Sequence, residues 1–455
     1  MNNAVNNQAL VDALAKNLPE DASEVEVDQI FASELFNFLG FQVNERVPSF
    51  HTRSRTNPVD HALRHNREDD IFNQTRTNPD VLVELKKRNL NLAPGSKGYK
   101  DTFTQIQRYL LAENCKAAKW GIITNANHIQ LFRKHEKVVH PATICLGINP
   151  ENIIKIATLI KEKIDKPRKA LTVAVYNNKG GVGKTTTTVN TAAALSLSGK
   201  KVLIVDFDPN QRDMTNCLAI KPSTPTFYDS LIDKNINVRD VISPYIGYKK
   251  SKKEYGFDVI PVHEELSNFN WDNITQEITF DRLSKELEQL KNNYDYILID
   301  SPTNWSIFSV SAVYAADVVL LPVEHNSLPS LENAAKTIKE YIPKVQQARR
   351  KNRDFGPIAL PIFFNGGKMS EPQKRRVQIY IDKLIQDTQK NSNNKFNLQP
   401  YFYPYYTKAS KNRTIFELPY HAAIANYAFL HTPAAYKNKV VYDNYKSLVK
   451  EYFLQ

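Results

Sequence analysis

Long apolar runs are missing from this chain of 455 residues, and none approaches the roughly 18 uninterrupted apolar residues of a membrane-spanning helix. The first residues carry no basic segment followed by an apolar one, so we expect no secretory signal. The only cysteines, Cys115, Cys145 and Cys217, are scattered without metal-ligand spacing. With 42% hydrophobic and 24% charged residues, the composition predicts a globular, cytoplasmic protein with reduced thiols.

Acidic residues are also in deficit, with 48 Asp and Glu against 60 Lys and Arg, which gives a formal net charge of +12. A basic excess of this size favours a polyanionic partner. DNA fits better than a membrane surface, because no amphipathic anchor is visible; a Lys-rich solvated surface is the plainer alternative. The densest basic runs are Arg349 to Arg353 and Lys374 to Arg376, followed by Lys408, Lys411 and Arg413.

A glycine-rich segment follows the apolar run 171–176 and precedes an Ala- and Leu-bearing helical pattern at 186–197. Strand, glycine-rich turn and helix in this order let backbone N–H groups wrap a phosphate chain. Lys184 then reaches the β- and γ-phosphates, and Thr185 is placed for Mg²⁺. The sequence therefore predicts an ATP site with Mg²⁺, formed by Gly180, Gly181, Val182, Gly183, Lys184, Thr185 and Thr186.

An extra lysine, Lys179, makes this loop resemble the deviant Walker A loop of the ParA and MinD ATPases. Two further blocks, KVLIVDFDP at 201–209 and YDYILIDSP at 294–302, are similar to the second strand and the Walker B strand of that family. The resemblance implies a P-loop fold with a mostly parallel sheet flanked by helices. It also implies that ATP drives a homodimer in which Lys179 reaches the partner's nucleotide.

Acidic residues end both strands, as ATP hydrolysis requires, because the protein mainly positions Mg²⁺, the phosphates and a water. Asp300 is suited to the magnesium shell. By the resemblance, Asp208 orients the attacking water, Asp206 supports the metal, and Asn365, at the end of the strand pattern 360–365, contacts adenine. The segment from Asp208 to Asp213 is one residue longer than is usual in the family, so we transfer no role to Gln211.

The same resemblance implies partners and a cellular role. ParA relatives bind DNA without sequence preference through late Lys and Arg residues, so we expect a nucleoid-associated ATPase for DNA partition or cargo positioning, with a ParB-like or adaptor protein as partner. The aromatic run 401–406 is able to stack on unpaired bases, but an edge strand packed on a helix is the favoured interpretation.

Residues 1–166 precede the strand that opens the ATPase fold, so we predict two domains, at 1–166 and 167–455. In the first, residues 69–72 and 80–87 read as a β-hairpin whose second strand places Glu84 and Lys86 on one face. Two carboxylates with a lysine suit metal-dependent phosphodiester cleavage. We favour Asp70 over Asp80 as the first acid.

This arrangement resembles the PD-(D/E)xK nucleases, and more narrowly the N-terminal nuclease domain of type I restriction HsdR subunits. An acidic helix at 24–41, the Gln105 to Tyr109 pattern and a strand at 120–125 agree with it. The resemblance implies a restriction-endonuclease-like α/β domain, with Asp70 and Glu84 holding Mg²⁺ and with Lys86 and Gln105 in catalysis. Glu26 is our choice for the helical acid and Glu34 the alternative. A nucleotide-gated nuclease and a DNA-docking remnant both remain open.

Overall fold

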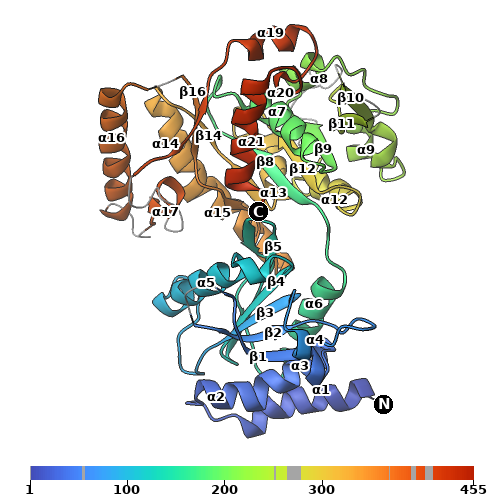
Figure 1. The fold of residues 1–455 in the computed structure, drawn as a ribbon, viewed down its shortest axis with the longest axis vertical. Coiled ribbons are helices and arrows are strands. Elements are labelled where there is room, and N and C mark those ends of the chain that lie inside the picture. The colour runs from blue at the N-terminus through green and yellow to red at the C-terminus, as the bar shows by residue number, and fades with distance from the viewer. Residues whose placement is uncertain are drawn as a thin grey trace. The chain divides into compact units, whose positions relative to one another are not determined.

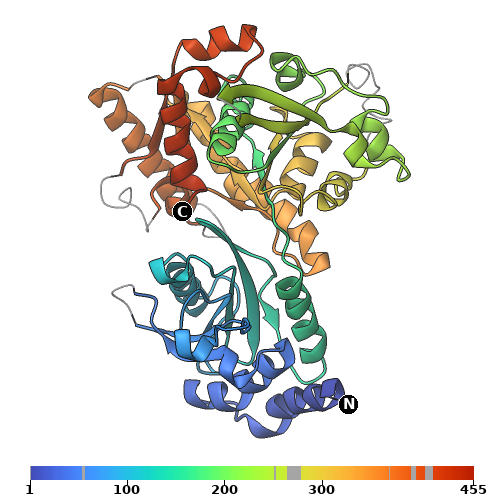
Figure 2. The ribbon, with the colours of Figure 1, turned by 45° about the vertical axis from the view of Figure 1, so that its right-hand side comes forward.

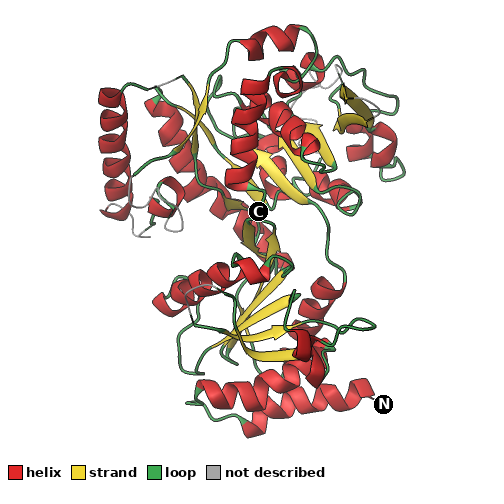
Figure 3. Ribbon diagram, viewed as in Figure 1, coloured by secondary structure: helices red, strands yellow, loops and turns green. Residues whose placement is uncertain are grey.

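The computed structural model describes residues 2–53, 57–250, 253–263, 278–367, 369–390, 396–404 and 413–455. It contains two compact units: unit 1 comprises 1–167, 352–355 and 453–455, and unit 2 comprises 168–351 and 356–452. Each unit is built from strands flanked by helices (Figure 3). None of the described helices is long and apolar enough to cross a membrane.

Unit 1 contains a mixed sheet whose first six strands lie side by side in chain order, with β7 paired to β5. β3 and β4 run parallel, and the other neighbouring strands run antiparallel. The strands are β1 (Arg46–Phe50), β2 (Val59–Leu63), β3 (Val81–Leu85), β4 (Trp120–Thr124), β5 (His128–His135), β6 (Val138–Pro141) and β7 (Leu146–Gly147).

Helices cover both faces of this sheet (Figure 1). Because side chains alternate along a strand, Val81 and Val83 pack with α3 and α6, whereas Leu82 packs with α5 on the other face. The helices of unit 1 are α1 (Asn2–Asp12), η1 (Ala13–Asn17), α2 (Glu24–Glu26), η2 (Val27–Ala32), α3 (Ser33–Leu39), η3 (Val43–Glu45), α4 (Phe72–Thr75), α5 (Lys97–Leu110), η4 (Glu113–Cys115) and α6 (Ile153–Asp165).

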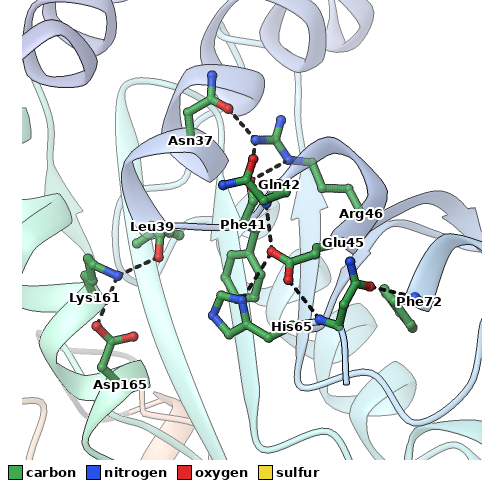
Figure 4. A network of polar contacts seen from close by, with 11 residues as sticks. Asn37, Leu39, Phe41, Gln42, Glu45, Arg46, His65, Phe72, Lys161 and Asp165 are labelled. Atoms are coloured by element: carbon green, nitrogen blue, oxygen red, sulfur yellow. Dashed lines mark hydrogen bonds and ion pairs between the residues drawn. The ribbon is translucent and has the colours of Figure 1, made fainter. Parts of the chain in front are cut away.

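A polar network holds the start of β1 against the chain that leaves β2 (Figure 4). The carboxylate of Glu45 accepts hydrogen bonds from the backbone N–H groups of Gln42 and Asn66, both at 2.8 Å. The same carboxylate contacts the ring of His65 at 3.2 Å, and that ring stacks on Phe41. The segment after β2 is therefore fixed to η3 and does not continue as a strand.

The predicted hairpin is wrong in its first strand. Residues 69–72 form a turn that leads into α4, and the antiparallel partner of β3 is β2. The reason is Arg64, whose side chain is fully buried and donates to the carbonyl of Thr77 at 3.1 Å and to the carboxylate of Asp70 at 2.6 Å. These bonds fold the segment 64–77 back on itself.

Unit 2 contains a seven-stranded sheet in the order β10-β11-β9-β12-β8-β13-β15, parallel except for the β10–β11 hairpin. The central strands are mostly apolar and are buried along their whole length, as expected for a parallel sheet covered on both faces. The strands are β8 (Leu171–Val175), β9 (Val202–Asp206), β10 (Ser243–Lys250), β11 (Lys253–Ile260), β12 (Tyr296–Asp300), β13 (Val318–Leu320) and β15 (Ile358–Ala359).

A second, parallel sheet has the order β14-β16-β17, with β14 (Pro322–Glu324), β16 (Phe363–Gly366) and β17 (Phe416–Pro419). Helices surround both sheets of unit 2, as the turned view also shows (Figure 2). They are α7 (Lys184–Leu197), α8 (Asp213–Cys217), α9 (Phe227–Ile232), η5 (Val238–Val241), α12 (Arg282–Glu288), α13 (Ile307–Ala315), α14 (Leu328–Lys336), η6 (Thr337–Tyr341), α15 (Ile342–Arg349), η7 (Arg350–Asn352), α16 (Glu371–Lys390), α17 (Gln399–Phe402), α19 (Ala423–Phe429), α20 (Ala434–Lys437) and α21 (Lys439–Tyr452).

Residues 401–404 of the aromatic run do not form an edge strand. Tyr401 and Phe402 end the short helix α17, and Phe402 and Tyr403 are buried in the core beside α16. Tyr405 and Tyr406 lie outside the described residues, as do Lys408 and Lys411. The favoured interpretation of an edge strand packed on a helix is therefore wrong for the described residues of the run, which end a short helix and pack in the core.

Candidate functional site

The glycine-rich segment lies between β8 and α7, and its backbone adopts the conformation that a phosphate loop needs. Gly181 and Gly183 both have φ of 80°, in the left-handed region that favours glycine. A Cβ on Gly183 would lie 2.3 Å from the side-chain nitrogen of Asn365. Gly180 and Gly181 are exposed while Val182 is buried, so the loop offers its backbone at the start of a helix, where anions bind.

Lys184, the first residue of α7, is buried near Asp300, which ends β12, and Asp208, which follows β9. Its ammonium group donates to the carbonyl of Lys179 at 3.4 Å, and Lys179 itself is half-buried in the loop. Burial lowers the pKa of Lys184, and the nearby carboxylates of Asp300 and Asp208 act in the opposite direction. The structure therefore brings the predicted lysine and the predicted acids together.

Thr185 and Asp300 form the best-defined pair of this site. The Thr185 hydroxyl donates to one Asp300 oxygen at 2.6 Å, and the other Asp300 oxygen is buried without a partner among the described residues. Burial raises the pKa of Asp300 to about 8, and the neighbouring Asp206 carboxylate contributes to the increase. A hydroxyl and an unsatisfied carboxylate oxygen are the hard donors that Mg²⁺ prefers, so these residues fit a magnesium ion.

Asp206 is engaged with protein donors. One of its oxygens accepts from the backbone N–H of Thr215 at 2.8 Å and from the Thr215 hydroxyl at 2.6 Å, and the other accepts from the N–H of Asp208 at 3.3 Å. The Thr215 hydroxyl in turn accepts from the N–H of Val262. Asp206 therefore ties α8 to the ends of β9 and β11, and its predicted support of the metal stays a prediction.

Asp208 is half-buried at the start of the longer segment, and its carboxylate accepts from the N–H groups of Asn210 and Gln211 at 3.2 and 3.4 Å. Burial raises its pKa. Asp213, which begins α8, is a further acid near Lys184. Sequence reasoning assigned it no role, although the segment from Asp208 to Asp213 is one residue longer than usual. Thr186 lies half-buried in the first turn of α7.

A second group of acids lies in unit 1, where β2 and β3 are antiparallel neighbours. His61 pairs with Val83, so Asp60 stands opposite Glu84 and their side chains share a face of the sheet. The Asp60 carboxylate accepts from the backbone N–H of Leu85 at 2.6 Å. Asp60, which sequence reasoning missed, is therefore the acid beside the Glu-x-Lys pattern.

Glu84 is 1% exposed, and its two carboxylate oxygens have different surroundings. One is ion-paired with the ammonium group of Lys86, and the other is buried without a hydrogen-bond partner among the described residues. Burial raises the pKa of Glu84 to about 7, and the charge of Asp60 adds to this effect. Glu24, on α2, reaches Lys86 at 4.0 Å.

The other predicted acids of unit 1 are engaged elsewhere, and the structure does not bring Asp70 to Glu84. Hydrogen bonds from Arg64 and Thr75 lower the pKa of Asp70 to about 2. Glu26 accepts from the N–H of its helix N-cap Ser23 at 2.8 Å and completes a capping box. The remaining contacts are those of Glu34 with the amide of Asn37, and of Gln105 with the hydroxyl of Tyr109.

Asp80 is a separate case, because it immediately precedes β3, whereas the paired acid lies on β2. Neither Asp70 nor Asp80 is the acid that stands opposite Glu84. The register of β2 and β3 puts Asp60 in that place. Across the described ranges, no group of three or more His, Cys, Asp or Glu side chains is arranged to hold a metal ion. The unit 1 group therefore offers two facing carboxylates, of Asp60 and Glu84, and a lysine.

Comparison with known proteins finds a family and relatives for part of this chain. A family model described as an AAA domain (AAA_31) matches residues 170–355. The sporulation initiation inhibitor protein Soj of Bacillus subtilis is 37% identical over 174 residues, which are 37% of this chain and 64% of Soj. The chromosome-partitioning ATPase Soj of Treponema pallidum is 30% identical over 219 residues, 48% of this chain and 81% of that protein. The chromosome partitioning protein ParA of Myxococcus xanthus is 30% identical, with 47% and 72% covered.

Solved structures with a similar outline include the ATP complex of a Cyanothece McdA variant, with 19% identity, a TM-score of 0.44, and coverage of 62% of this chain and 96% of that one. The structure of pNOB8 ParA bound to nonspecific DNA has 19% identity, a TM-score of 0.41, and coverage of 62% and 99%. At these scores the likeness says nothing further about this chain.

Proposed function

Because the chain belongs to the ParA and Soj family of chromosome-partitioning ATPases, we propose that unit 2 binds ATP with Mg²⁺, dimerises when ATP is bound and hydrolyses ATP slowly. The observation that carries this proposal is the Thr185 to Asp300 hydrogen bond, which joins the phosphate loop to the end of β12 and leaves one carboxylate oxygen for the metal. Thr185 and Asp300 would hold magnesium, which when bound would neutralise part of the phosphate charge.

Residues of this chain bind the phosphates and orient the attacking water. Backbone N–H groups from Gly180 to Thr185 hold the phosphates, and Lys184 stabilises the negative charge that spreads over the transferred phosphoryl group. Asp208, half-buried and electrostatically close to Lys184, orients the attacking water. Asp206 acts indirectly by fixing α8 through Thr215.

Dimerisation depends on Lys179 in this proposal. We expect the full chain to be a monomer with ADP and a dimer with ATP, and Lys179→Ala to remain a monomer with ATP. Light scattering coupled to size-exclusion chromatography measures this. Lys234→Ala, which changes an exposed lysine after α9, is the control and should dimerise normally. An ATP-dependent dimer of Lys179→Ala would contradict the role of this lysine.

The structure shows which residues of the predicted basic runs are exposed and therefore available to bind DNA. Arg349 is buried, and its guanidinium donates to the carbonyls of Tyr314 and Ala316 at 2.9 and 2.8 Å, so it serves the fold. Arg375 and Arg376 are exposed on α16. We propose that α16 contributes phosphate contacts to DNA that is bound without sequence preference.

We expect Arg375→Glu together with Arg376→Glu to weaken ATP-dependent DNA binding and to reduce the slope of log K against log salt by about 2, one unit for each lost phosphate contact. Fluorescence anisotropy with duplexes of two unrelated sequences, at several salt concentrations, measures the slope. Lys234→Glu changes charge on another surface segment and should leave the slope unchanged. An unaltered slope in the α16 variant would exclude these contacts.

We further propose the family's biological role, DNA partition or cargo positioning on the nucleoid with a ParB-like or adaptor protein as partner. It is supported by the relatives named as chromosome-partitioning proteins and by the net charge of +12. Co-purification of one stimulating protein, followed by measurement of ATP turnover with and without it, tests this role.

A second function is favoured for unit 1 by one specific observation, the buried and unpartnered oxygen of Glu84 opposite Asp60. Two facing carboxylates of this kind fit a divalent cation, which when bound polarises a phosphate and activates water. Lys86 is ion-paired with Glu84 and holds that carboxylate in place. We propose that unit 1 is a Mg²⁺-dependent DNA nuclease module, with Asp60 in the role that sequence reasoning assigned to Asp70.

A further inference from the structure

The helix α19 (Ala423–Phe429) has no side that is packed against the rest of the chain. All of its residues are described, and none of them is buried. Every side chain of the helix is apolar or aromatic except that of Asn426. Phe429 is 84% exposed, and Leu430, which follows the helix, is 65% exposed. A helix this short draws its stability from packing, so an exposed apolar helix indicates a surface that a partner covers.

Hydrogen bonds on both sides of α19 fix this segment in unit 2. Before the helix, the backbone N–H of Tyr420 donates to the carbonyl of Gly366 at 2.7 Å. After the helix, the backbone N–H of Ala435 donates to the side-chain oxygen of Asn190 at 2.9 Å. The exposed helix is therefore held at a defined place on unit 2.

That place is the edge of unit 2 that carries the phosphate loop. β16 and β17 are parallel, so their carboxyl ends lie at one edge, and α19 follows the end of β17. At the end of β16, the side-chain amide of Asn365 donates to the carbonyl of Val182 in the phosphate loop at 2.8 Å. α8, which follows the acid-bearing end of β9, lies at the same end of unit 2 as α19 (Figure 1).

Charge distinguishes between the possible occupants of this surface. Residues 418–436 contain no Asp, Glu, Lys or Arg. DNA and acidic proteins bind to positive charge, which this segment lacks. Two copies of a chain with a net charge of +12 repel each other, so they meet most readily through a surface without positive charge. A second copy of this chain therefore suits α19 better than a polyanion does.

We propose that α19 is an apolar contact of the ATP-bound homodimer and is covered by unit 2 of a second copy of this chain. This inference rests on the proposed ATP-dependent dimer, because a lysine that reaches the partner's nucleotide brings the second copy to the edge where α19 lies. Phe429 and Leu430 are the anchors, since burial of large apolar side chains stabilises an interface. Lys179 makes the dimer depend on the nucleotide, and α19 adds apolar burial to it.

The test compares the full chain with a double variant, Phe429→Asp with Leu430→Asp, in the presence of Mg²⁺ and a non-hydrolysable ATP analogue. Light scattering coupled to size-exclusion chromatography measures the mass over a range of protein concentrations. We expect the dissociation constant of the dimer to rise at least about 100-fold, because two charged groups replace two buried apolar ones. Phe429→Leu keeps an apolar side chain and should dimerise nearly as the parent does.

Two controls separate this contact from charge and from folding. Ile379→Asp introduces one negative charge at an apolar residue of α16 that is 69% exposed, and should dimerise as the parent does. ADP, with which we expect the chain to stay a monomer, should bind the double variant and the parent with equal affinity in a calorimetric titration, because the proposed nucleotide site of the monomer does not include α19.

Dimerisation of the double variant at the parent's concentrations would overturn the inference, leave the proposed dimer intact and make a different protein the occupant of α19. Loss of ADP binding together with the dimer would also overturn it, because α19 would then support the nucleotide site of its own chain. If the parent stayed a monomer with the analogue, the proposed ATP-dependent dimer itself would fail, and the inference with it.

Discussion

Lys184→Ala is expected to lower ATP turnover at least about 100-fold, because it removes the fixed positive charge at the phosphoryl group. Lys184 is buried between the phosphate loop and the carboxylates of Asp300 and Asp208, so no other described side chain occupies its place. Release of phosphate under steady-state conditions, at saturating Mg²⁺ and ATP, measures the effect.

Two controls separate chemistry from folding in this experiment. Thermal unfolding should show a stable fold for Lys184→Ala, since the substitution removes a buried charge without opening a large apolar cavity. Lys234→Ala, with its exposed lysine after α9, should turn over ATP at the parent rate. Parent-like turnover in Lys184→Ala would defeat the assignment of the loop as catalytic.

The core of unit 2 was predicted well from sequence, because each element there is specified locally. Apolar β-rich runs indicated β8, β9 and β12, and glycines marked the loop before α7. Thr185 and Asp300 were each assigned to the magnesium ion from sequence, and the hydrogen bond between them is an observation of the structure. The hydrogen bond from Asn365 to the carbonyl of Val182 was harder to predict, because it depends on where β16 pairs with β14.

Unit 1 shows where sequence reasoning fails. The strand with Glu84 and the helix with Gln105 were correctly located, but the partner of β3 was chosen by proximity in sequence. The register of β2 was not readable, because the buried Arg64 and its bonds to the segment 70–77 decide where the chain turns. Glu26 was chosen as the helical acid, although the serine three residues before it signalled a cap.

The assignment of Asp60 in place of Asp70 predicts that variants of these two residues differ in DNA cleavage. If the parent chain cleaves supercoiled DNA with Mg²⁺, Asp60→Asn and Glu84→Gln should each lower the cleavage rate at least about 100-fold, because each removes a charged metal ligand. Asp70→Asn, at the acid that sequence reasoning favoured, should leave cleavage near the parent rate, because Asp70 pairs with Arg64. Gel assays on supercoiled and linear DNA, with and without ATP, give the rates.

Cation binding supplies a readout that does not depend on cleavage. Calorimetric titration of the full chain with Mn²⁺, in the absence of nucleotide, should show a site that Asp60→Asn weakens and Asp70→Asn retains. Loss of cleavage in Asp70→Asn alone would restore the original hairpin assignment and contradict the register of β2 and β3. If no variant or condition gives cleavage while ATP-dependent DNA binding persists, unit 1 is a docking domain. Cleavage that requires ATP would instead place the nuclease under the control of unit 2, because the proposed ATP site lies in unit 2 whereas Asp60 and Glu84 lie in unit 1.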